Sequence, residues 1–389
     1  MRFAVFHLIM ALWVLWRFVL PLRMAKGAKW ALALVIVAVS LFSTVTTLFF
    51  GGLLSPELPR AVLIAGNFGE AVLLFLTVFT LLREVVIFFS VLAGRSGEKL
   101  HRAVQQDRRT AIGLGALSVG FAAFGIKKGI EVPEVRYHTA KIQDLPSELE
   151  GFEFVQLSDT HCSALLTEPH AEALVERVNS LHPRLILMTG DFVDGAVERR
   201  EKDIAPFAKL RAEYGVWGCD GNHEHYGDYP RWEEKFAQLG IRVLRNEHAV
   251  LEVEGNDGKP ARLCLGGVCD PMAARFGREL PDVRKTFAGA PDPKAVPRIL
   301  MAHQPKMFPR YRANEEFALQ LSGHTHGGQI IGMDRAVAIM NGTYVRGFYR
   351  SPEGTLLYVH PGSGLWNGFP IRVGVPSEIA VIRLERRRA

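Results

Sequence analysis

Hydrophobic residues are unevenly distributed along this chain of 389 residues. Apolar segments fill most of residues 1–130, whereas residues 131–389 have the mixed composition of a soluble domain. A helix needs about 20 apolar residues to cross a bilayer. The pattern therefore predicts a transmembrane region with about four helices, at approximately 3–22, 30–50, 61–92 and 110–126. The third would be one long or kinked helix with an interfacial end.

Two alternative explanations of the apolar segments are weaker. A secretory signal peptide accounts for one such segment but not for four. Buried core helices of a soluble protein are the other alternative. Glu70 lies within the third segment, where a carboxylate is costly and often functional. It serves a transport or relay role, faces a neighbouring helix, or sits near the membrane interface if the span starts later.

The distribution of basic residues predicts how the chain crosses the membrane. Cytoplasmic loops are enriched in Lys and Arg. The loops after the first segment and before the fourth are basic, whereas Arg60 is the one basic residue among the short connecting residues between the second and third. The basic residues of those two loops are Arg23, Lys26 and Lys29, and Arg95, Lys99, Arg102, Arg108 and Arg109. We therefore expect a multi-pass inner-membrane protein whose C-terminal domain is extracytoplasmic, although Lys127 and Lys128 favour the opposite side.

Short apolar runs alternate with amphipathic segments in the C-terminal part of the chain. Strands are predicted in FEFVQL, RLILMT and GVWGC, and at 262–265, 298–302, 318–321, 356–360 and 378–384. Helices are predicted in EPHAEALVERVNSL, APFAKLRAEY and PRWEEKFAQLG. Repeated strand-then-helix units predict a layered α/β core. We expect a linker and first strand at 131–150 and a catalytic domain at 151–389.

Polar residues recur immediately after the predicted strands. Ligands of an α/β sheet gather beyond the carboxyl ends of its strands, so these residues are expected to meet at one edge. They are Asp159, His161, Asp191, Asn222, His223, His303, His324 and His326. The last two lie in the glycine-rich segment SGHTHGGQ, where a turn allows both rings to reach a common centre.

This mixture of side chains is typical of a metal site. Carboxylate, amide and imidazole ligands suit Mn²⁺, Fe or Zn²⁺ better than Ca²⁺. The set is too large for one ion but fits two that share a carboxylate. Such a pair polarises a phosphoryl group and supplies a bridging hydroxide as the nucleophile. None of the cysteines is required, and Cys264 and Cys269 could instead form a disulfide in an oxidising compartment.

The motifs together resemble the calcineurin-like metallophosphoesterase superfamily, whose pattern is DxH, GD, GNH[ED], a lone His and GHxH. The matching segments are Asp159-Thr160-His161, Gly190-Asp191, Gly221-Asn222-His223-Glu224, His303 and Gly323-His324-Thr325-His326. The resemblance covers roughly residues 150–385. GHTHGGQ and the tail PIRVGVPSEIAVIRL are similar to the bacterial membrane-associated phosphodiesterase branch. The implied fold is a four-layer αββα arrangement, a β-sandwich flanked by helices.

The resemblance also implies roles for individual residues. Asp159, His161 and His326 would hold one metal ion. Asn222, His303 and His324 would hold the second, and Asp191 would bridge the two. His223 would be the catalytic residue that contacts the phosphoryl oxygen or protonates the leaving group.

Residues around these motifs carry less specific expectations. Asp194 and Glu224 would orient ligand histidines, although loop solvation is an equal alternative for Asp194. His360 and Arg372 lie in the last segments and are candidates for substrate binding. His225 is expected at the surface and Cys162 as a packed thiol.

The expected function is a membrane-anchored, dimetal-dependent phosphoesterase acting on a phosphodiester or phosphomonoester of a lipid-linked or envelope substrate. One alternative is a UDP-2,3-diacylglucosamine-type pyrophosphate hydrolase of lipid A synthesis, which would be cytoplasmic. A non-enzymatic alternative is a membrane scaffold that uses the metal fold to bind a partner, and a third is a transporter with an accessory phosphatase domain. No nucleic-acid-binding module is recognisable, and the oligomeric state is left open.

Overall fold

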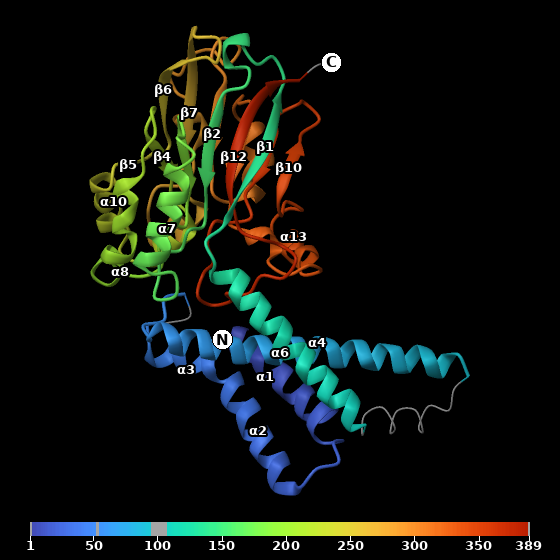
Figure 1. Ribbon diagram of the computed structural model, residues 1–389. Coiled ribbons are helices and arrows are strands. Elements are labelled where there is room, and N and C mark those ends of the chain that lie inside the picture. Colours follow the sequence, from blue (N-terminus) through green and yellow to red (C-terminus); the bar gives the residue numbers. More distant parts are fainter. Residues whose placement is uncertain (1, 52–53, 95–106, 388–389) are drawn as a thin grey trace. The chain divides into compact units, whose positions relative to one another are not determined.

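The computed structural model describes residues 2–51, 54–94 and 107–387 (Figure 1). The chain forms two compact units, an N-terminal unit of Met1–Lys128 with Asn367–Val373 and a C-terminal unit of Gly129–Trp366 with Gly374–Ala389. Arg95, Lys99 and Arg102 of the predicted basic loop lie outside the described residues.

The N-terminal unit is helical. Its elements are α1 (Arg2–Val14), the π-helix η1 (Leu15–Val19), α2 (Lys26–Ser40), α3 (Phe42–Phe49), α4 (Arg60–Leu92) and α6 (Arg108–Ile130). Among the described residues, three segments are long and apolar enough to cross a membrane: Lys26–Phe49, Arg60–Leu92 and Arg108–Ile130. The first predicted span is shorter than expected, since its apolar helix covers Ala4–Val19. Pro21, which has no backbone N–H to donate, follows closely.

The third predicted span is one continuous helix of 33 residues. The charged pair in its second half does not interrupt it. Arg83 donates to Glu84 Oε1 at 2.6 Å and to the carbonyl oxygen of Arg17 at 2.7 Å. Because both charges are matched within the unit, the helix continues through them.

Glu70 faces a neighbouring helix, as one of the alternatives for it predicted. Its Oε1 accepts hydrogen bonds from the backbone N–H, at 3.0 Å, and the hydroxyl of Ser43. His7 Nε2 lies 3.8 Å from the same oxygen. Ser43 lies in the first turn of α3, just after the interruption between α2 and α3. Glu70 therefore supplies an acceptor where the helical hydrogen-bond ladder is broken.

The C-terminal unit contains two six-stranded sheets. In spatial order, the first sheet holds β1 (Glu134–Ile142), β12 (Glu378–Arg386), β2 (Glu153–Leu157), β3 (Ile186–Thr189), β4 (Val216–Cys219) and β5 (Ile241–Val243). The second holds β10 (Gly347–Arg350), β11 (Leu356–Val359), β9 (Leu319–Ser322), β8 (Arg298–Met301), β7 (Pro260–Gly267) and β6 (Glu247–Glu254). Neighbouring strands from β2 to β5, and among β11, β9, β8 and β7, run parallel.

Alternate residues of the central strands point into different layers of the core. Phe154 of β2 packs between the sheets with residues of the second sheet, whereas Val155 packs under the helices. The first sheet is covered by α7 (Glu168–Asn179), α8 (Val197–Ile204) and α10 (Tyr229–Gln238), and the second by α11 (Val283–Thr286) and α12 (Phe308–Arg312) (Figure 1). Strands buried on both faces are largely apolar, as in β3, β8 and β11. The predicted four-layer αββα sandwich is confirmed.

Short helices complete the unit. They are η2 (Ser147–Leu149), η3 (Ala205–Lys209), α9 (Asn222–Tyr226), η4 (Pro271–Phe276), η5 (Pro305–Met307), η6 (His326–Gly328) and α13 (Asp334–Met340). The helix predicted in APFAKLRAEY is wrong, because that segment forms only η3 and then extends at Leu210. The α-helix lies just before it, in α8, where Arg200 pairs with Asp203 at 3.1 Å on the buried face. A buried face made partly of charged residues leaves no apolar periodicity to detect.

Candidate metal centre

The predicted site residues follow the carboxyl ends of five parallel strands. Asp159 and His161 come after β2, Asp191 after β3, and Asn222 and His223 after β4. From the second sheet, His303 follows β8, and His324 and His326 follow β9. The two sheets are tied at this edge by His303 Nδ1, which lies 2.7 Å from the carbonyl oxygen of Thr189.

Two glycines are required by the close approach of the turns that carry these residues. A Cβ at Gly221 would overlap Asp191 Oδ1, and one at Gly323 would overlap Ser158 Oγ. A side chain at either position would push two strand ends apart. The glycines of the GNH and GH motifs are thus explained by packing as well as by chemistry.

The backbone is strained at this edge. Five of the predicted ligands adopt left-handed backbone conformations, which residues other than glycine seldom adopt. Their φ angles are 53° at Asp159, 44° at His161, 54° at Asp191, 71° at His324 and 49° at His326. Such strain persists where the surrounding structure fixes it, and it clusters at functional sites.

One group of potential ligands is formed by Asp159, His161 and His326. The Nε2 atoms of the two histidines face each other at 3.2 Å, and His326 Nε2 lies 3.5 Å from Asp159 Oδ1. All three side chains are buried. This is the set that the family resemblance assigns to the first metal ion.

A second group is formed by Asp191, His303 and His324. His303 Nε2 lies 3.1 Å from Asp191 Oδ2, and the rings of His303 and His324 are 5.1 Å apart between centroids. Asn222 is buried beside this group at the start of α9, where the next residue, His223, donates its backbone N–H to Asp191 Oδ1 at 2.8 Å. The predicted second set is therefore brought to one place.

His223 and His161 are held by one carboxylate. Asp194 Oδ1 lies 2.6 Å from His223 Nδ1 and 2.9 Å from His161 Nδ1. Asp194 is fully buried, so the alternative that it is a solvated loop residue is wrong. A carboxylate on Nδ1 fixes the tautomer of each ring and leaves Nε2 for a metal ion or a substrate.

Glu224 and His225 differ from the expectations for them. Glu224 accepts hydrogen bonds from the backbone N–H groups of Gly221, Asp191 and Phe192 at 2.7, 3.0 and 2.6 Å, so it fixes two turns and does not orient a histidine. His225 is fully buried, 3.0 Å from Asp220, and stacks on Tyr229 with ring centroids 4.3 Å apart. The short helix α9 turns it inward, which the sequence around it did not indicate. Cys162 is a packed thiol as expected, and Cys264 and Cys269 are buried and free.

The electrostatic environment separates the titratable groups. Burial raises the pKa of Asp159, whereas for Asp191 the imidazoles of His303 and His223 outweigh burial and hold the pKa well below its usual range. Burial and the charge of His303 lower the pKa of His324 to about 3, which keeps this ring neutral. Burial disfavours the charged form of His223, but Asp191 and Asp194 prevail and raise its pKa to about 9. The pKa values of His324 and His223 are thus shifted in opposite directions within one site.

His360 and Arg372, the two predicted substrate-binding residues, are not among the clustered potential ligands. His360 is buried at the end of β11, and its Nδ1 accepts the backbone N–H of Gly362 at 2.9 Å. Arg372 belongs to the segment that clusters with the N-terminal unit, where its backbone N–H donates to Gly125 at 3.0 Å. Their contact with substrate stays a prediction.

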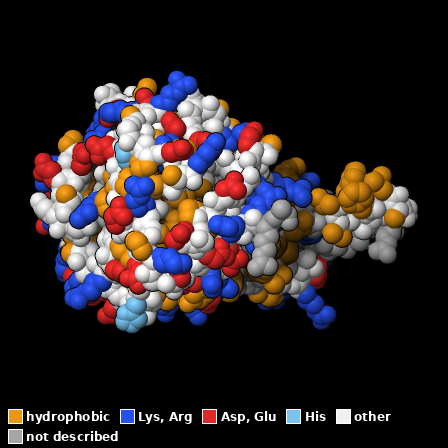
Figure 2. Space-filling model, turned by 90° about the horizontal axis from the view of Figure 1, so that it is seen from above, with side chains coloured by type: hydrophobic (Ala, Val, Ile, Leu, Met, Phe, Trp, Pro, Cys, Tyr) orange, Lys and Arg blue, Asp and Glu red, His pale blue; other side chains and the backbone are white. Residues whose placement is uncertain are grey.

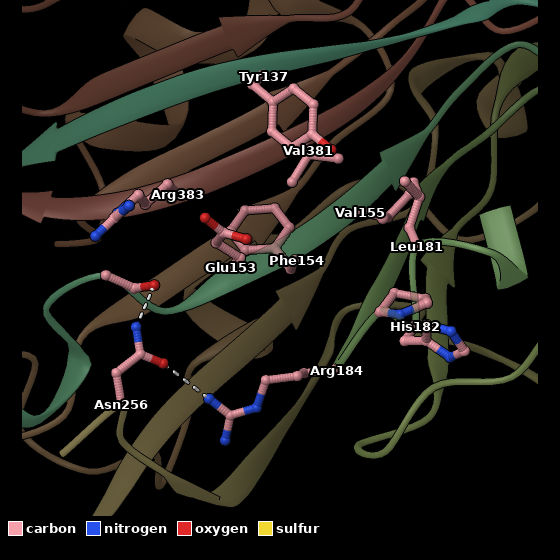
Figure 3. Close-up of a pocket in the computed structure, with 12 residues that line it drawn as sticks. Tyr137, Glu153, Phe154, Val155, Leu181, His182, Arg184, Asn256, Val381 and Arg383 are labelled. Atoms are coloured by element: carbon pink, nitrogen blue, oxygen red, sulfur yellow. Dashed lines mark hydrogen bonds between the residues drawn. The ribbon is translucent and has the colours of Figure 1, made fainter.

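The pocket in Figure 3 lies at the other ends of the strands. Its volume is about 320 Å³, and it opens beside the amino ends of β2 and β3, between residues such as Glu153, Leu181 and Arg383. Asn256 bridges its wall, accepting from Arg184 at 3.3 Å and donating to Gly151 at 2.6 Å. The predicted site residues do not line it.

The donor set at the metal centre fits divalent ions. Two imidazole nitrogens that face each other at 3.2 Å, beside a carboxylate, are arranged as ligands of a common cation are. Asn222 Oδ1 is buried and accepts no hydrogen bond from the part of the chain that the structure describes. A buried polar atom without a partner is costly, and a metal ion would satisfy it.

Comparisons with known proteins agree with this geometry. The calcineurin-like phosphoesterase family model matches residues 152–328. The chain is 31% identical over 317 residues to a transmembrane protein with metallophosphoesterase domain from Danio rerio, covering 78% of this chain and 71% of that protein. The chain belongs to the calcineurin-like metallophosphoesterases. An uncharacterized metallophosphoesterase of Helicobacter pylori is 31% identical over 266 residues, covering 68% of each chain. The corresponding transmembrane protein of Bos taurus is 29% identical over 319 residues, covering 80% of this chain and 70% of that one.

Membership of this metallophosphoesterase family favours an enzyme over a non-enzymatic scaffold. The protein is a metal-dependent phosphoester hydrolase with apolar N-terminal helices, which weighs against a purely non-enzymatic scaffold. Divalent metal ions are implied by the family, and the clustered aspartates and histidines provide their binding residues.

Proposed function

We propose that this metallophosphoesterase is membrane-anchored and hydrolyses a phosphodiester or phosphomonoester of a lipid-linked or envelope molecule. Two ions of Mn, Fe or Zn would be held by Asp159, His161 and His326, and by Asn222, His303 and His324, with Asp191 between them. The proposal rests on one observation above all. Among the clusters of potential ligands in the described residues, Asp159 with His161 and His326, and Asp191 with His303 and His324, follow strands at the same edge of the sandwich.

The protein's own groups would bind and protonate the substrate. When bound, divalent ions polarise phosphoryl oxygens and lower the pKa of water. His223 has the geometry of a general acid, because Asp194 holds its Nδ1 and leaves Nε2 on the side of Asp191, 3.9 Å from Oδ2. With its pKa raised to about 9, His223 is protonated at neutral pH and can donate a proton to the leaving group.

The membrane half of the chain supports a substrate carried by the membrane. A hydrolase on transmembrane helices is held where lipid-linked substrates are concentrated. The basic loops favour an inner-membrane protein with an extracytoplasmic catalytic unit. The alternative, a UDP-2,3-diacylglucosamine-type pyrophosphate hydrolase, requires the opposite side. A reporter fused after Ala389 that is active only outside the cytoplasm would exclude this alternative.

The catalytic proposal is tested with the full-length protein in detergent. Hydrolysis of bis-p-nitrophenyl phosphate and of p-nitrophenyl phosphate is measured with added Mn²⁺ for the parent protein, His324→Ala and His223→Ala. We expect loss of turnover in both variants, because one removes a ligand and the other the proton donor. His182→Ala removes a histidine that lines the pocket of Figure 3 and should retain activity. Full turnover in His324→Ala would refute the assigned site, and the preferred reporter distinguishes diesterase from monoesterase.

A further inference from the structure

An apolar surface is formed by residues that follow His324 and His326 closely in the chain. It consists of Ile331, Met333, Ile339 and Met340, on α13 and the segment before it, and is called the α13 surface here. Ile339 is 84% exposed, Met340 69% and Ile331 67%. No residue of α13 is buried, so packing within the protein does not account for these side chains. Clustered exposed hydrophobic residues mark interaction sites.

The α13 surface is connected to the metal centre through one arginine. Arg346 donates from Nη1 to the carbonyl oxygen of Gly327 at 2.6 Å, in the turn that follows the ligand His326. Its Nη2 lies 3.5 Å from Asp334, the first residue of α13. The helix that presents the apolar side chains is thus held to the ligand-bearing turn.

Basic residues surround the α13 surface. Arg335 is exposed on α13 itself, and Arg346 is exposed beside it. Lys306 is exposed and lies against Gly342, just beyond the helix, where a Cβ would be 3.7 Å from Lys306 Cα. Asp334 is the acidic residue of α13 and is already paired with Arg346. The local excess of positive charge complements an anionic surface.

We infer that the α13 surface inserts into the headgroup region of a lipid bilayer. Exposed Ile and Met side chains bordered by Arg and Lys are typical of elements that lie in a membrane interface. The described part of the same chain carries three helices that are long and apolar enough to span a bilayer. In the C-terminal unit, α13 lies at the end opposite the β6–β7 turn (Figure 1). On the face of this unit seen in Figure 2, basic and acidic side chains are mixed, which distinguishes that face from the α13 surface.

This contact would bring the metal centre to the lipid surface. A phosphoester at the headgroup level could then reach the metal ligands without leaving the bilayer. Insertion of the α13 surface into a bilayer does not depend on the proposed function, whereas its use in catalysis rests on that function.

The test measures lipid contact directly in the full-length protein in nanodiscs containing an anionic phospholipid. Ile339→Cys and Met340→Cys are each labelled with a fluorophore, which is selective because the four native cysteines are buried. Asp257→Cys, in the turn between β6 and β7, is the matched control. Quenching by doxyl-labelled lipid is compared with quenching by iodide in water.

We expect lipid-borne quenching at residues 339 and 340 to exceed that at 257 by about twofold or more, with iodide giving the reverse order. Iodide quenching at 339 equal to that at 257, without lipid quenching, would overturn the inference. Protection from both quenchers together with self-quenching between labels would mean that a second copy covers the surface, which also overturns it. Hydrolysis of bis-p-nitrophenyl phosphate by the labelled proteins reports separately on the metal centre.

Discussion

At the scale of single residues, the geometry of the candidate metal centre depends on side chains that do not themselves belong to the predicted ligand set. Asp194 holds two histidines through one oxygen, and Glu224 fixes the turns after β3 and β4. The clustering of the predicted ligands could be anticipated, because each follows a predicted strand and all but the lone His303 belong to a recognisable motif. The partner of a buried acid could not be predicted, because Glu224 binds backbone N–H groups that leave no trace in the sequence.

Replacing Asp194 by Asn should slow the reaction and change its pH dependence. A carboxylate behind a catalytic or ligand histidine contributes about 10- to 100-fold in activity or metal affinity. Protonated His223 is lost as the pH rises through its pKa of about 9, and this pKa falls when the carboxylate that raises it is removed. The alkaline limb of the kcat profile should therefore move to lower pH in Asp194→Asn.

The measurement is kcat against pH for the parent, Asp194→Asn and Asp203→Asn. Asp203 is a carboxylate of α8 that pairs with Arg200, so its replacement removes a charge without touching either histidine. An unchanged alkaline limb in Asp194→Asn would show that Asp194 does not act through His223.

At the scale of the elements, strands were easier to predict than helices. The apolar runs that became β2, β3, β4, β8 and β9 are buried on both faces and are followed by the predicted ligands. By contrast, α8 buries the Arg200–Asp203 pair, and the edge strands β6 and β10 are partly exposed. Elements whose positions depend on tertiary contacts of polar residues carry no hydrophobic period, so a sequence pattern cannot locate them.

Glu224→Gln should loosen the junction between β3 and β4. The amide of Gln accepts hydrogen bonds at one oxygen only. At least one of the three backbone N–H groups that Glu224 binds would therefore face an NH₂ group and lose its acceptor. Leaving one buried donor unsatisfied costs about 1–3 kcal/mol. We expect a lower melting temperature and a weaker dependence of activity on added Mn²⁺ at low concentrations of the ion, because the turn that carries Asn222 is less fixed.

Glu213→Gln is the control for this variant, since Glu213 is an exposed partner of Arg184. Its melting temperature should stay close to that of the parent, as exposed ion pairs contribute about 0–1 kcal/mol. Equal melting temperatures for the two variants would contradict the structural role given to Glu224.

At the scale of the whole molecule, the chain joins a helical unit to a sandwich whose predicted ligands come from both sheets. Asp159 and Asp191 arise from the first sheet, and His303, His324 and His326 from the second. An ion bound between them would therefore cross-link the two sheets. The same residues would serve catalysis and the stability of the C-terminal unit.

Metal removal should consequently change stability as well as activity. Binding to the folded state alone stabilises it by RT ln(1 + [L]/Kd), about 2.7 kcal/mol when the free ion is at 100 times Kd. Treatment with EDTA should abolish hydrolysis of bis-p-nitrophenyl phosphate and lower the melting temperature of the C-terminal unit, and Mn²⁺ should restore both. In His324→Ala, which already lacks a ligand, the shift on chelation should be smaller. An equally large shift of the melting temperature in this variant would mean that the stabilising ion binds elsewhere, because the variant has already lost the cross-link through His324.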